Sequence, residues 1–444
     1  MVIDPALLEK YGGNGPRYTS YPTADRFGAD FDEATLRGYL EKRTSSQPWS
    51  LYMHLPFCDT LCYYCACNKV ITRDHSKSAK YVEYLEREMA MFEPLLGEER
   101  RVCQLHWGGG TPTLLARDEM RRLVRAVDAR FQRTADFECS IEVDPRRLAP
   151  GTLSFLGDLG FNRISIGVQD FDPVVQKAVH RIQSEEVTRA AIEEARASGF
   201  RSVNLDLIYG LPKQTVEGFS ATLDKVIALA PDRLALYSYA HLPAAFKPQR
   251  RIAEADLPAG EAKLAILKLA IERLRGAGYV YIGMDHFARP DDTLALAQAR
   301  GSLQRNFQGY STYPECDMLS FGISAIGRVG PAYYQNVKTL PEYYATLDAG
   351  RLPIARGVEL TPDDLERRAL IQALACNFHV HVDASRFVPE FDELRSLQAD
   401  GLVKLRGGEI TVTPAGRLLV RRVCMVFDRY LRERRERATY SKVV

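Results

Sequence analysis

The chain has 444 residues and a formal net charge of +2, with 59 Lys and Arg against 57 Asp and Glu. The near balance argues against a polyanionic partner such as a nucleic acid, and the length indicates a main domain with flanking pieces. The run Arg417–Arg437 is a local basic excess whose apolar residues recur at helical spacing. We expect it to form an amphipathic helix with a solvated basic face.

Nothing in the sequence predicts export or membrane insertion. Asp4, Pro5 and Glu9 interrupt the apolar pattern of Met1–Lys10, which does not fit a signal peptide. No apolar run is long enough to cross a bilayer. Nine cysteines in such a chain should be mostly thiols in a reducing compartment, so we expect a cytoplasmic protein that binds no membrane.

An irregular arm at Gly12–Ala24 is followed by alternating strand and helix signals. Strands are predicted at Ser50–His54, Val102–Trp107, Phe137–Val143, Asn162–Val168, Ser202–Ile208, Arg233–Tyr239 and, more weakly, Tyr279–Met284. Helices are predicted at Ser78–Phe92, Arg117–Phe131, Ser184–Ser198, Thr215–Leu229 and Gly260–Gly276. This alternation indicates an α/β fold with a parallel sheet.

Each predicted strand has one apolar face and one polar or small face. Side chains alternate along a strand, so Asn204 and Asp206 share one face, while Val203, Leu205 and Leu207 form the other. A doubly wound sheet would be apolar on both faces. The pattern therefore predicts a barrel whose polar lumen holds a ligand, with its chemistry at the carboxyl ends of the strands.

Beyond about Ser324 the alternation stops. Thr361–Phe378 is predicted to be helical, and Glu393–Val403, Leu405–Val412 and Pro414–Leu431 have the helix, hairpin and helix pattern of a winged helix. Because the charge is nearly balanced, this pattern favours a structural cap over a DNA-binding module. We therefore expect an N-terminal arm at 1–35, a barrel at 36–325 and a mostly helical domain at 326–444.

Four of the cysteines crowd into one loop directly after the first predicted strand. Cys58, Cys62 and Cys65 have CxxxCxxC spacing, with the aromatic Tyr64 before the third. Three thiolates can hold a 4Fe-4S cluster and leave one iron open. Zinc, the main alternative, usually takes four ligands in two separated pairs, and a thioredoxin-like pair leaves Cys58 unexplained. We predict a redox-active cluster, for which Cys67 lies too close to Cys65 to be an easy fourth ligand.

This loop resembles that of the radical S-adenosylmethionine (SAM) enzymes, as does the run His106–Pro112 with its three glycines after the second strand. In that superfamily the open iron binds SAM, and an electron from the cluster cleaves it to a 5′-deoxyadenosyl radical. Glycines let the backbone approach a ligand closely, and here they would contact the methionyl amine.

More narrowly, the chain resembles the oxygen-independent coproporphyrinogen III oxidases over nearly its whole length. The shared motifs are Gly15–Thr23, the cysteine motif through Cys67, Ser140–Pro145, Ser165–Asp170, Asn204–Pro212, Gly283–Phe287 and Cys424–Asp428. The resemblance implies an incomplete (β/α)6 TIM-like barrel with an N-terminal arm and a mostly helical, winged-helix-like C-terminal domain. It also implies oxidative decarboxylation of two propionate groups of coproporphyrinogen III to vinyl groups, giving protoporphyrinogen IX in heme biosynthesis.

The same resemblance implies two bound SAM molecules. By motif match, the contacts of the cluster-bound SAM would be Tyr52, Tyr64, Gly109, Glu142 and Ile326. Those of the second would be Gly110, Thr111, Gln169, Arg181, Asp206 and Ala240. Tyr52, His54 and Glu142 are expected to be catalytic, and Arg17 of the arm to anchor a substrate carboxylate. The stretch Ile326–Tyr333 matches the family less closely than its neighbours.

A low-potential one-electron donor protein of the flavodoxin or ferredoxin type is implied as a partner, and we expect a monomer. One alternative is a heme chaperone of the same superfamily. Such relatives typically lack the arm Gly15–Thr23 and the cysteine at the Cys67 position, both present here. The other alternative is a different radical SAM enzyme that modifies a tetrapyrrole, such as a heme-degrading methyltransferase.

Overall fold

The computed structural model describes residues 5–313, 316–433, 440 and 442–443. They form two compact units. The barrel unit comprises Phe27–Arg273 and Glu315–Glu359, and the terminal unit comprises Met1–Arg26, Leu274–Pro314 and Leu360–Val444. The division into segments 1–35, 36–325 and 326–444 stays a prediction.

The barrel unit is built on parallel strands that pair in chain order. They are β1 (Trp49–Leu55), β4 (Arg101–Gly109), β5 (Gln132–Val143), β6 (Arg163–Gln169), β7 (Ser202–Tyr209) and β8 (Arg233–Ser238). On the other side of β1 lie β13 (Met318–Phe321, parallel to β1), β14 (Ile326–Val329), β15 (Ala332–Asn336) and β16 (Ile354–Glu359), the last three antiparallel. A small pair joins β2 (Phe57–Cys58) and β3 (Val70–Ile71).

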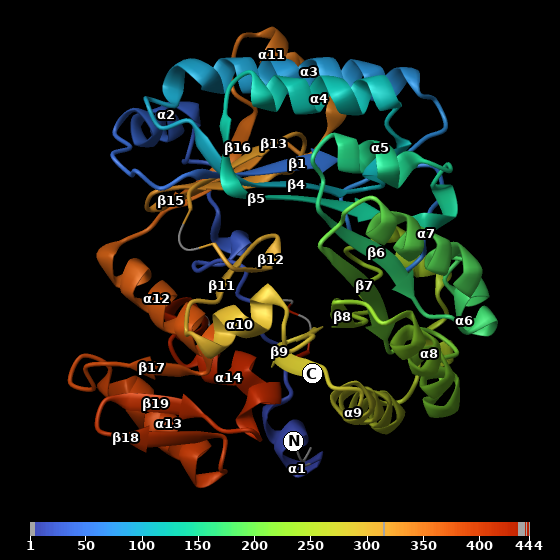
Figure 1. Ribbon diagram of the computed structural model, residues 1–444. Coiled ribbons are helices and arrows are strands. Elements are labelled where there is room, and N and C mark those ends of the chain that lie inside the picture. The colour runs from blue at the N-terminus through green and yellow to red at the C-terminus, as the bar shows by residue number, and fades with distance from the viewer. Residues whose placement is uncertain (1–4, 314–315, 434–439, 441, 444) are drawn as a thin grey trace. The chain divides into compact units, whose positions relative to one another are not determined.

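Helices of the barrel unit follow the strands along the chain. They are α2 (Glu33–Glu41), α3 (Ser76–Phe92), α4 (Arg117–Asp128), α5 (Thr152–Asp158), α6 (Pro173–Ala178), α7 (Glu185–Ala197), α8 (Val216–Leu229), α9 (Gly260–Gly276) and α11 (Leu340–Asp348). Short 3-10 helices lie at Glu93–Leu95, Pro112–Leu114, Pro145–Arg147, Lys247–Arg251 and Glu254–Asp256. Figure 1 shows α3, α4, α5, α7 and α8 along the outer side of the strands. Six strand–helix units in series confirm the predicted incomplete barrel.

The predicted division of strand faces is confirmed at β7. Val203, Leu205 and Leu207 are fully buried, and each such side chain contributes about 1.5–3 kcal/mol of burial free energy. Asn204 and Asp206 between them are only half-buried. The apolar face therefore holds the barrel together, whereas the polar face stays available to a ligand.

In the terminal unit, the elements are α1 (Pro5–Tyr11), β9 (Val280–Gly283), β10 (His286–Ala288), α10 (Thr293–Ala299), β11 (Gln304–Asn306), β12 (Gly309–Ser311), α12 (Pro362–Asn377), β17 (His379–His381), α13 (Val388–Ala399), β18 (Val403–Arg406), β19 (Glu409–Val412), α14 (Val420–Met425) and α15 (Arg429–Glu433), with 3-10 turns at Ala24–Arg26 and Gly416–Leu419. The sheet order β17-β19-β18 beside α13 gives the predicted winged-helix-like form. Tyr18 and Tyr21 of the irregular arm are buried in the same core as Phe427. None of the described helices is long and apolar enough to span a membrane.

The single helix predicted over Arg417–Arg437 is wrong. The described part is divided into a 3-10 turn and the short helices α14 and α15, and 434–439 lie outside the described residues. Asp428 causes the break, because its carboxylate accepts hydrogen bonds from two backbone N–H groups at the start of α15, as an N-cap does. Arg421 is buried rather than solvated.

Glu88 of α3 is fully buried and ties this helix to the segments around β13 and β15. Its carboxylate accepts hydrogen bonds from Gly322 N at 2.8 Å, Asn336 Nδ2 at 2.7 Å and Tyr343 Oη at 2.5 Å. Burial raises the pKa of Glu88 to about 7, although these donors oppose the rise. The group therefore takes up a proton on folding between its ordinary pKa and about 7.

Glu88→Gln tests this linkage. Because the folded state holds the proton more tightly, the wild-type free energy of unfolding should fall by up to about 3 kcal/mol as the pH rises from about 4.5 to 7. We expect the Gln variant to lack that part of the slope in urea unfolding across this range. Glu83→Gln, an exposed change on the same helix, should keep it. Identical slopes for wild type and Glu88→Gln would contradict the assignment.

Candidate functional site

The cysteine loop (residues 58–67) begins where β1 ends, and backbone hydrogen bonds close its base. The N–H groups of Val70 and Thr72 donate at 2.8 Å to the carbonyls of Pro56 and Cys58. These bonds pair β2 with β3. The backbone alone therefore sets where the loop leaves the barrel and where it returns.

The thiols predicted as cluster ligands lie beside cationic and hydroxyl donors. Arg146 Nη2 and Arg181 Nη1 lie 3.6 and 3.7 Å from Cys62 Sγ, and Thr111 Oγ1 lies 3.6 Å from Cys58 Sγ. The thiolate is the form that binds metal, and these donors lie beside the sulfur atoms. Three soft thiols on one loop beside guanidinium groups fit the ligand set of an iron–sulfur cluster.

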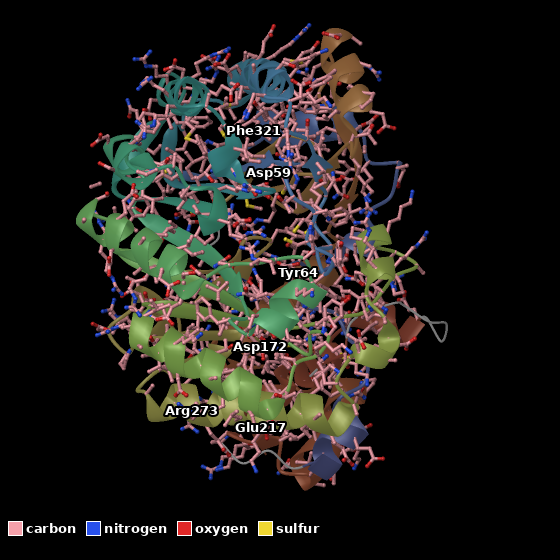
Figure 2. All side chains as sticks on the ribbon, turned by 90° about the vertical axis from the view of Figure 1, so that its right-hand side faces the viewer. Asp59, Tyr64, Asp172, Glu217, Arg273 and Phe321 are labelled. Carbon is pink, nitrogen blue, oxygen red and sulfur yellow. The ribbon has the colours of Figure 1, made fainter. Side chains whose placement is uncertain are left out.

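The thiols of this loop differ in protonation. The hydrogen bond with Cys67 lowers the pKa of Cys65 to about 6, whereas burial raises the pKa of Cys58 to about 12. Among the described residues, no three His, Cys, Asp or Glu side chains converge on a single metal ion. The thiolates of a cluster bind different irons and need not converge. Figure 2 labels Asp59 and Tyr64 of this loop.

The glycine-rich turn after β4 packs against the base of the cysteine loop. Gly110 N donates to Leu55 O, and the next N–H donates to Phe57 O, both at 2.8 Å. A Cβ on Gly110 would lie 2.6 Å from Phe57 O. Gly109 has a φ of +107°, and a Cβ there would lie 2.5 Å from the His54 ring. Packing within the chain therefore requires both glycines, apart from any contact with a ligand.

His54 is held in one neutral tautomer. Its Nε2 lies 2.8 Å from the carbonyl of Asn68, which can only accept, so Nε2 carries the hydrogen. Nδ1, 3.0 Å from Tyr52 Oη, therefore accepts from the phenol. Burial lowers the pKa of His54, so the ring is uncharged at neutral pH. Tyr81 Oη donates to the His54 carbonyl at 2.8 Å and fixes the backbone.

Glu142 supplies an anion at the end of β5. It accepts from Gly109 N at 3.0 Å and lies 3.4 Å from His106 Nε2, and the His106 ring stacks on Tyr52. Burial opposes ionisation, but the hydrogen bond and charge of His106 together with the Gly109 N–H lower the Glu142 pKa. Its side chain remains 45% exposed. The site therefore presents an accessible carboxylate, which suits an ammonium group of a ligand.

Arg181 connects the cysteine loop to β5 and β6. Its Nη1 lies 3.1 Å from Asp144 Oδ2, and its Nη2 donates to Gly167 O at 2.6 Å. Arg146 Nη2 shares the same carboxylate at 2.6 Å. The Nε of Arg181 is buried and has no hydrogen-bond partner in the part of the chain that the structure describes. A buried donor in this state favours an acceptor from a ligand.

Asp206 lies on the polar face of β7. It accepts from Ser165 Oγ at 2.9 Å and from Asn204 Nδ2 at 2.8 Å. Burial, and then the charge of Glu142, raise the pKa of Asp206 to about 6. The two carboxylates therefore influence each other electrostatically, although they stand on different strands.

The structure places most of the predicted site residues between the middle of a parallel strand and the segment that follows it, whereas Ile326 is the first residue of the antiparallel strand β14. These are Tyr52 and His54 on β1, Tyr64 in the cysteine loop, Gly109, Gly110 and Thr111 after β4, Glu142 on β5, Gln169 on β6, Arg181 after α6, Asp206 on β7, Ala240 after β8 and Ile326 on β14. Strand order puts Ile326 and Ala240 at opposite sides of this series, so sheet pairing does not bring them together. Their SAM contacts stay predictions.

Three polar residues of this site were not predicted. Asp144 shares the polar face of β5 with Glu142, so strand alternation was a signal for it. His106 belongs to the glycine-rich motif and contacts Glu142. Arg146 follows Pro145 in a 3-10 turn, where no periodic pattern marks a residue as functional.

Comparison with known proteins gives consistent matches. Residues 52–226 match the model of the radical SAM superfamily. The chain is 48% identical to oxygen-independent coproporphyrinogen III oxidases of Pseudomonas aeruginosa and Escherichia coli, and each match covers 99% of this chain and 98% of the relative. The solved structure of coproporphyrinogen III oxidase from Escherichia coli, described as a radical SAM enzyme, superimposes with a TM-score of 0.92. That match has 46% identity and covers 97% of this chain and 99% of the other.

Gly110→Ala tests the close packing of the glycine-rich turn. The added Cβ would meet backbone atoms below 3 Å, so we expect a loss of roughly 1–3 kcal/mol in the free energy of unfolding. Gly38→Ala, in the middle of α2 with open space around its Cβ, should instead gain about 0.5–1 kcal/mol. Urea unfolding of both variants measures the difference, and an unchanged Gly110→Ala protein would contradict the packing argument.

Proposed function

The chain belongs to the family of oxygen-independent coproporphyrinogen III oxidases, and we propose that it catalyses their reaction. In this reaction two propionate groups of coproporphyrinogen III are oxidatively decarboxylated to vinyl groups, giving protoporphyrinogen IX in heme biosynthesis. The full-length similarity, 48% identity over 99% of the chain, carries this proposal. When bound, the 4Fe-4S cluster and SAM that the superfamily implies would supply the radical chemistry needed to remove a hydrogen from the carbon β to a carboxylate.

In this proposal Cys58, Cys62 and Cys65 hold the cluster. Arg146 and Arg181 place positive charge beside Cys62, and positive charge near a bound cluster would favour its reduced state. The pairing of β2 with β3 closes the base of the cysteine loop. Backbone hydrogen bonds, rather than the thiols, therefore fix the position of the loop and of the thiols on it.

The polar lumen residues bind and orient SAM in this proposal. Glu142 accepts from the methionyl ammonium, since its carboxylate is ionised and accessible. Tyr52 and His54 form a neutral hydrogen-bonded pair, which can line the site without adding charge. Tyr64, Gly109 and Ile326 would complete the cluster-bound site.

A second SAM molecule is part of the proposal. The unpartnered Nε of Arg181 within the described chain and the protonatable Asp206 support a second polar site, completed by Gly110, Thr111, Gln169 and Ala240. Equilibrium dialysis of the anaerobically reconstituted protein with SAM measures the number bound. A stoichiometry of one would remove this part and leave the reaction itself standing.

The remaining proposals concern partners and location. We propose a flavodoxin- or ferredoxin-type protein as the low-potential electron donor, and a monomer as the working form. All nine cysteines are free thiols in the structure, which supports a reducing, cytoplasmic location. We propose that the protein acts without a nucleic-acid or membrane partner.

An anaerobic assay tests the reaction. The reconstituted protein is incubated with coproporphyrinogen III, SAM and a low-potential reductant, and the products are separated. We expect protoporphyrinogen IX together with 5′-deoxyadenosine. SAM cleavage without vinyl formation would contradict the oxidase and favour another tetrapyrrole-modifying radical SAM enzyme. Heme binding without turnover would instead indicate a heme chaperone.

Single Cys→Ser changes at Cys58, Cys62 and Cys65 test the ligand set. Each should abolish the visible absorbance of the cluster and essentially all activity, because a hydroxyl is a poor substitute for the thiolate ligand. Cys67→Ser is the matched control within the same loop and should retain bound iron. Iron content and visible spectra after anaerobic reconstitution check both results. A retained cluster in Cys62→Ser would exclude that residue as a ligand.

A further inference from the structure

Arg305 is a buried cation in the terminal unit that protein groups leave incompletely satisfied. It lies on β11 and is 8% exposed. Its Nε and Nη1 atoms are buried without a hydrogen-bond partner among the described residues. Among the arginines that the structure describes, it alone has two buried nitrogen atoms without a hydrogen-bond partner. A buried donor without an acceptor costs about 1–3 kcal/mol, and more when it is charged.

The position of Arg305 is fixed from two sides. Gln372 Nε2 on α12 donates to the Arg305 carbonyl at 2.9 Å. The guanidinium lies over the Tyr310 ring, 4.7 Å from its centroid, and Tyr310 Oη donates to Ala375 O at 3.1 Å. The ring offsets part of the cost through a cation–π contact, but it offers the N–H groups no lone pair. The guanidinium is therefore held in place, while its Nε and Nη1 have no acceptor among the residues that the structure describes.

Other positive charges lie close to Arg305. Arg421 is buried, and its guanidinium donates to backbone carbonyls, including that of Pro16 at 2.9 Å. Burial first, and then the charges of Arg17 and Arg305, lower the pKa of Arg421 to about 10. Arg17 forms an ion pair with Asp285, and the charge of this carboxylate also acts on Arg421. The cluster suits a further anion.

The same ion pair alters the expectation for Arg17. The sequence indicated Arg17 as the anchor of a substrate carboxylate, but its Nη1 is held by Asp285. Arg305 has the unsatisfied donors instead. Arg305 keeps 8% of its surface exposed, and the turn that follows it, from Asn306 to Gly309, is only half-buried.

We propose that Arg305 binds a carboxylate of the tetrapyrrole substrate. This inference rests on the proposed function, which supplies a substrate with four carboxylates. A carboxylate would accept from the buried N–H groups of Arg305 and balance its positive charge. Arg305 is thus a substrate-binding residue, and Arg17 and Arg421 add to the positive potential around it.

Binding of coproporphyrin III, the oxidised tetracarboxylate, tests the proposal without turnover. Fluorescence titration of the anaerobically reconstituted full chain measures its Kd. We expect Arg305→Met to weaken binding by about 10-fold or more, since a hydrogen bond to a charged group contributes about 1.5–3 kcal/mol. Arg305→Lys should recover part of the loss, because charge returns without the planar fork. Arg300→Met, an exposed change with the same loss of charge, should bind like wild type.

The tetramethyl ester of coproporphyrin III and SAM itself identify the group recognised. The ester has no carboxylates, so its binding should be equally weak in wild type and Arg305→Met. Weaker SAM binding in Arg305→Met with unchanged coproporphyrin binding would assign the site to another carboxylate and overturn the proposal. Unchanged coproporphyrin affinity in Arg305→Met would also overturn it. A wild-type protein that binds no coproporphyrin would overturn the proposed function as well.

Thermal unfolding separates ligand binding from a structural role. Removing an unsatisfied buried charge should stabilise the ligand-free protein, so Arg305→Met should raise Tm by about 2–4 °C while weakening coproporphyrin binding. A residue kept only for structure would show the reverse, a lower Tm with unchanged affinity. That result would overturn the proposal.

Discussion

Two backbone hydrogen bonds join the glycine-rich turn after β4 to the base of the cysteine loop after β1. They bring the chain so close that Gly110 has no room for a side chain. In the same turn, the N–H of Gly109 donates to Glu142 on β5, and the Cα of Gly109 lies against the His54 ring. The close approach of these two loops therefore sets the distances among the ends of β1, β4 and β5. The positions of the cysteine thiols, of His54 and of the Glu142 carboxylate all depend on it.

Charge is distributed unevenly around this framework. Arg146 and Arg181 stand at the cysteine loop, whereas the carboxylates of Glu142 and Asp206 stand on the strands β5 and β7. A ligand that carries both an ammonium and a carboxylate would meet complementary groups on the two sides. The protein thus favours a zwitterion in a space that is otherwise lined by neutral rings such as Tyr52 and His54.

Much of this could be predicted from local pattern. The six parallel strands were found because period-two alternation marks half-buried strands, and the thiols because their spacing is specific. β14 was missed because it has only four residues, and β15 was missed because it is buried along its whole length, so no alternation shows. The single helix over Arg417–Arg437 was mispredicted because Asp428 caps the start of a separate helix, α15. The unsatisfied state of Arg305 depends on distant neighbours, which no local pattern encodes.

The pairing of β2 with β3 has a consequence for how the holoprotein is assembled. Because backbone bonds close the loop at Pro56 and Cys58 and the apolar faces of the strands are already buried, the chain can reach its folded state before any iron arrives. Structural zinc domains, by contrast, remain unfolded until the metal binds. Loading of a cluster can then be a late step, because the backbone has already closed the loop that would hold it.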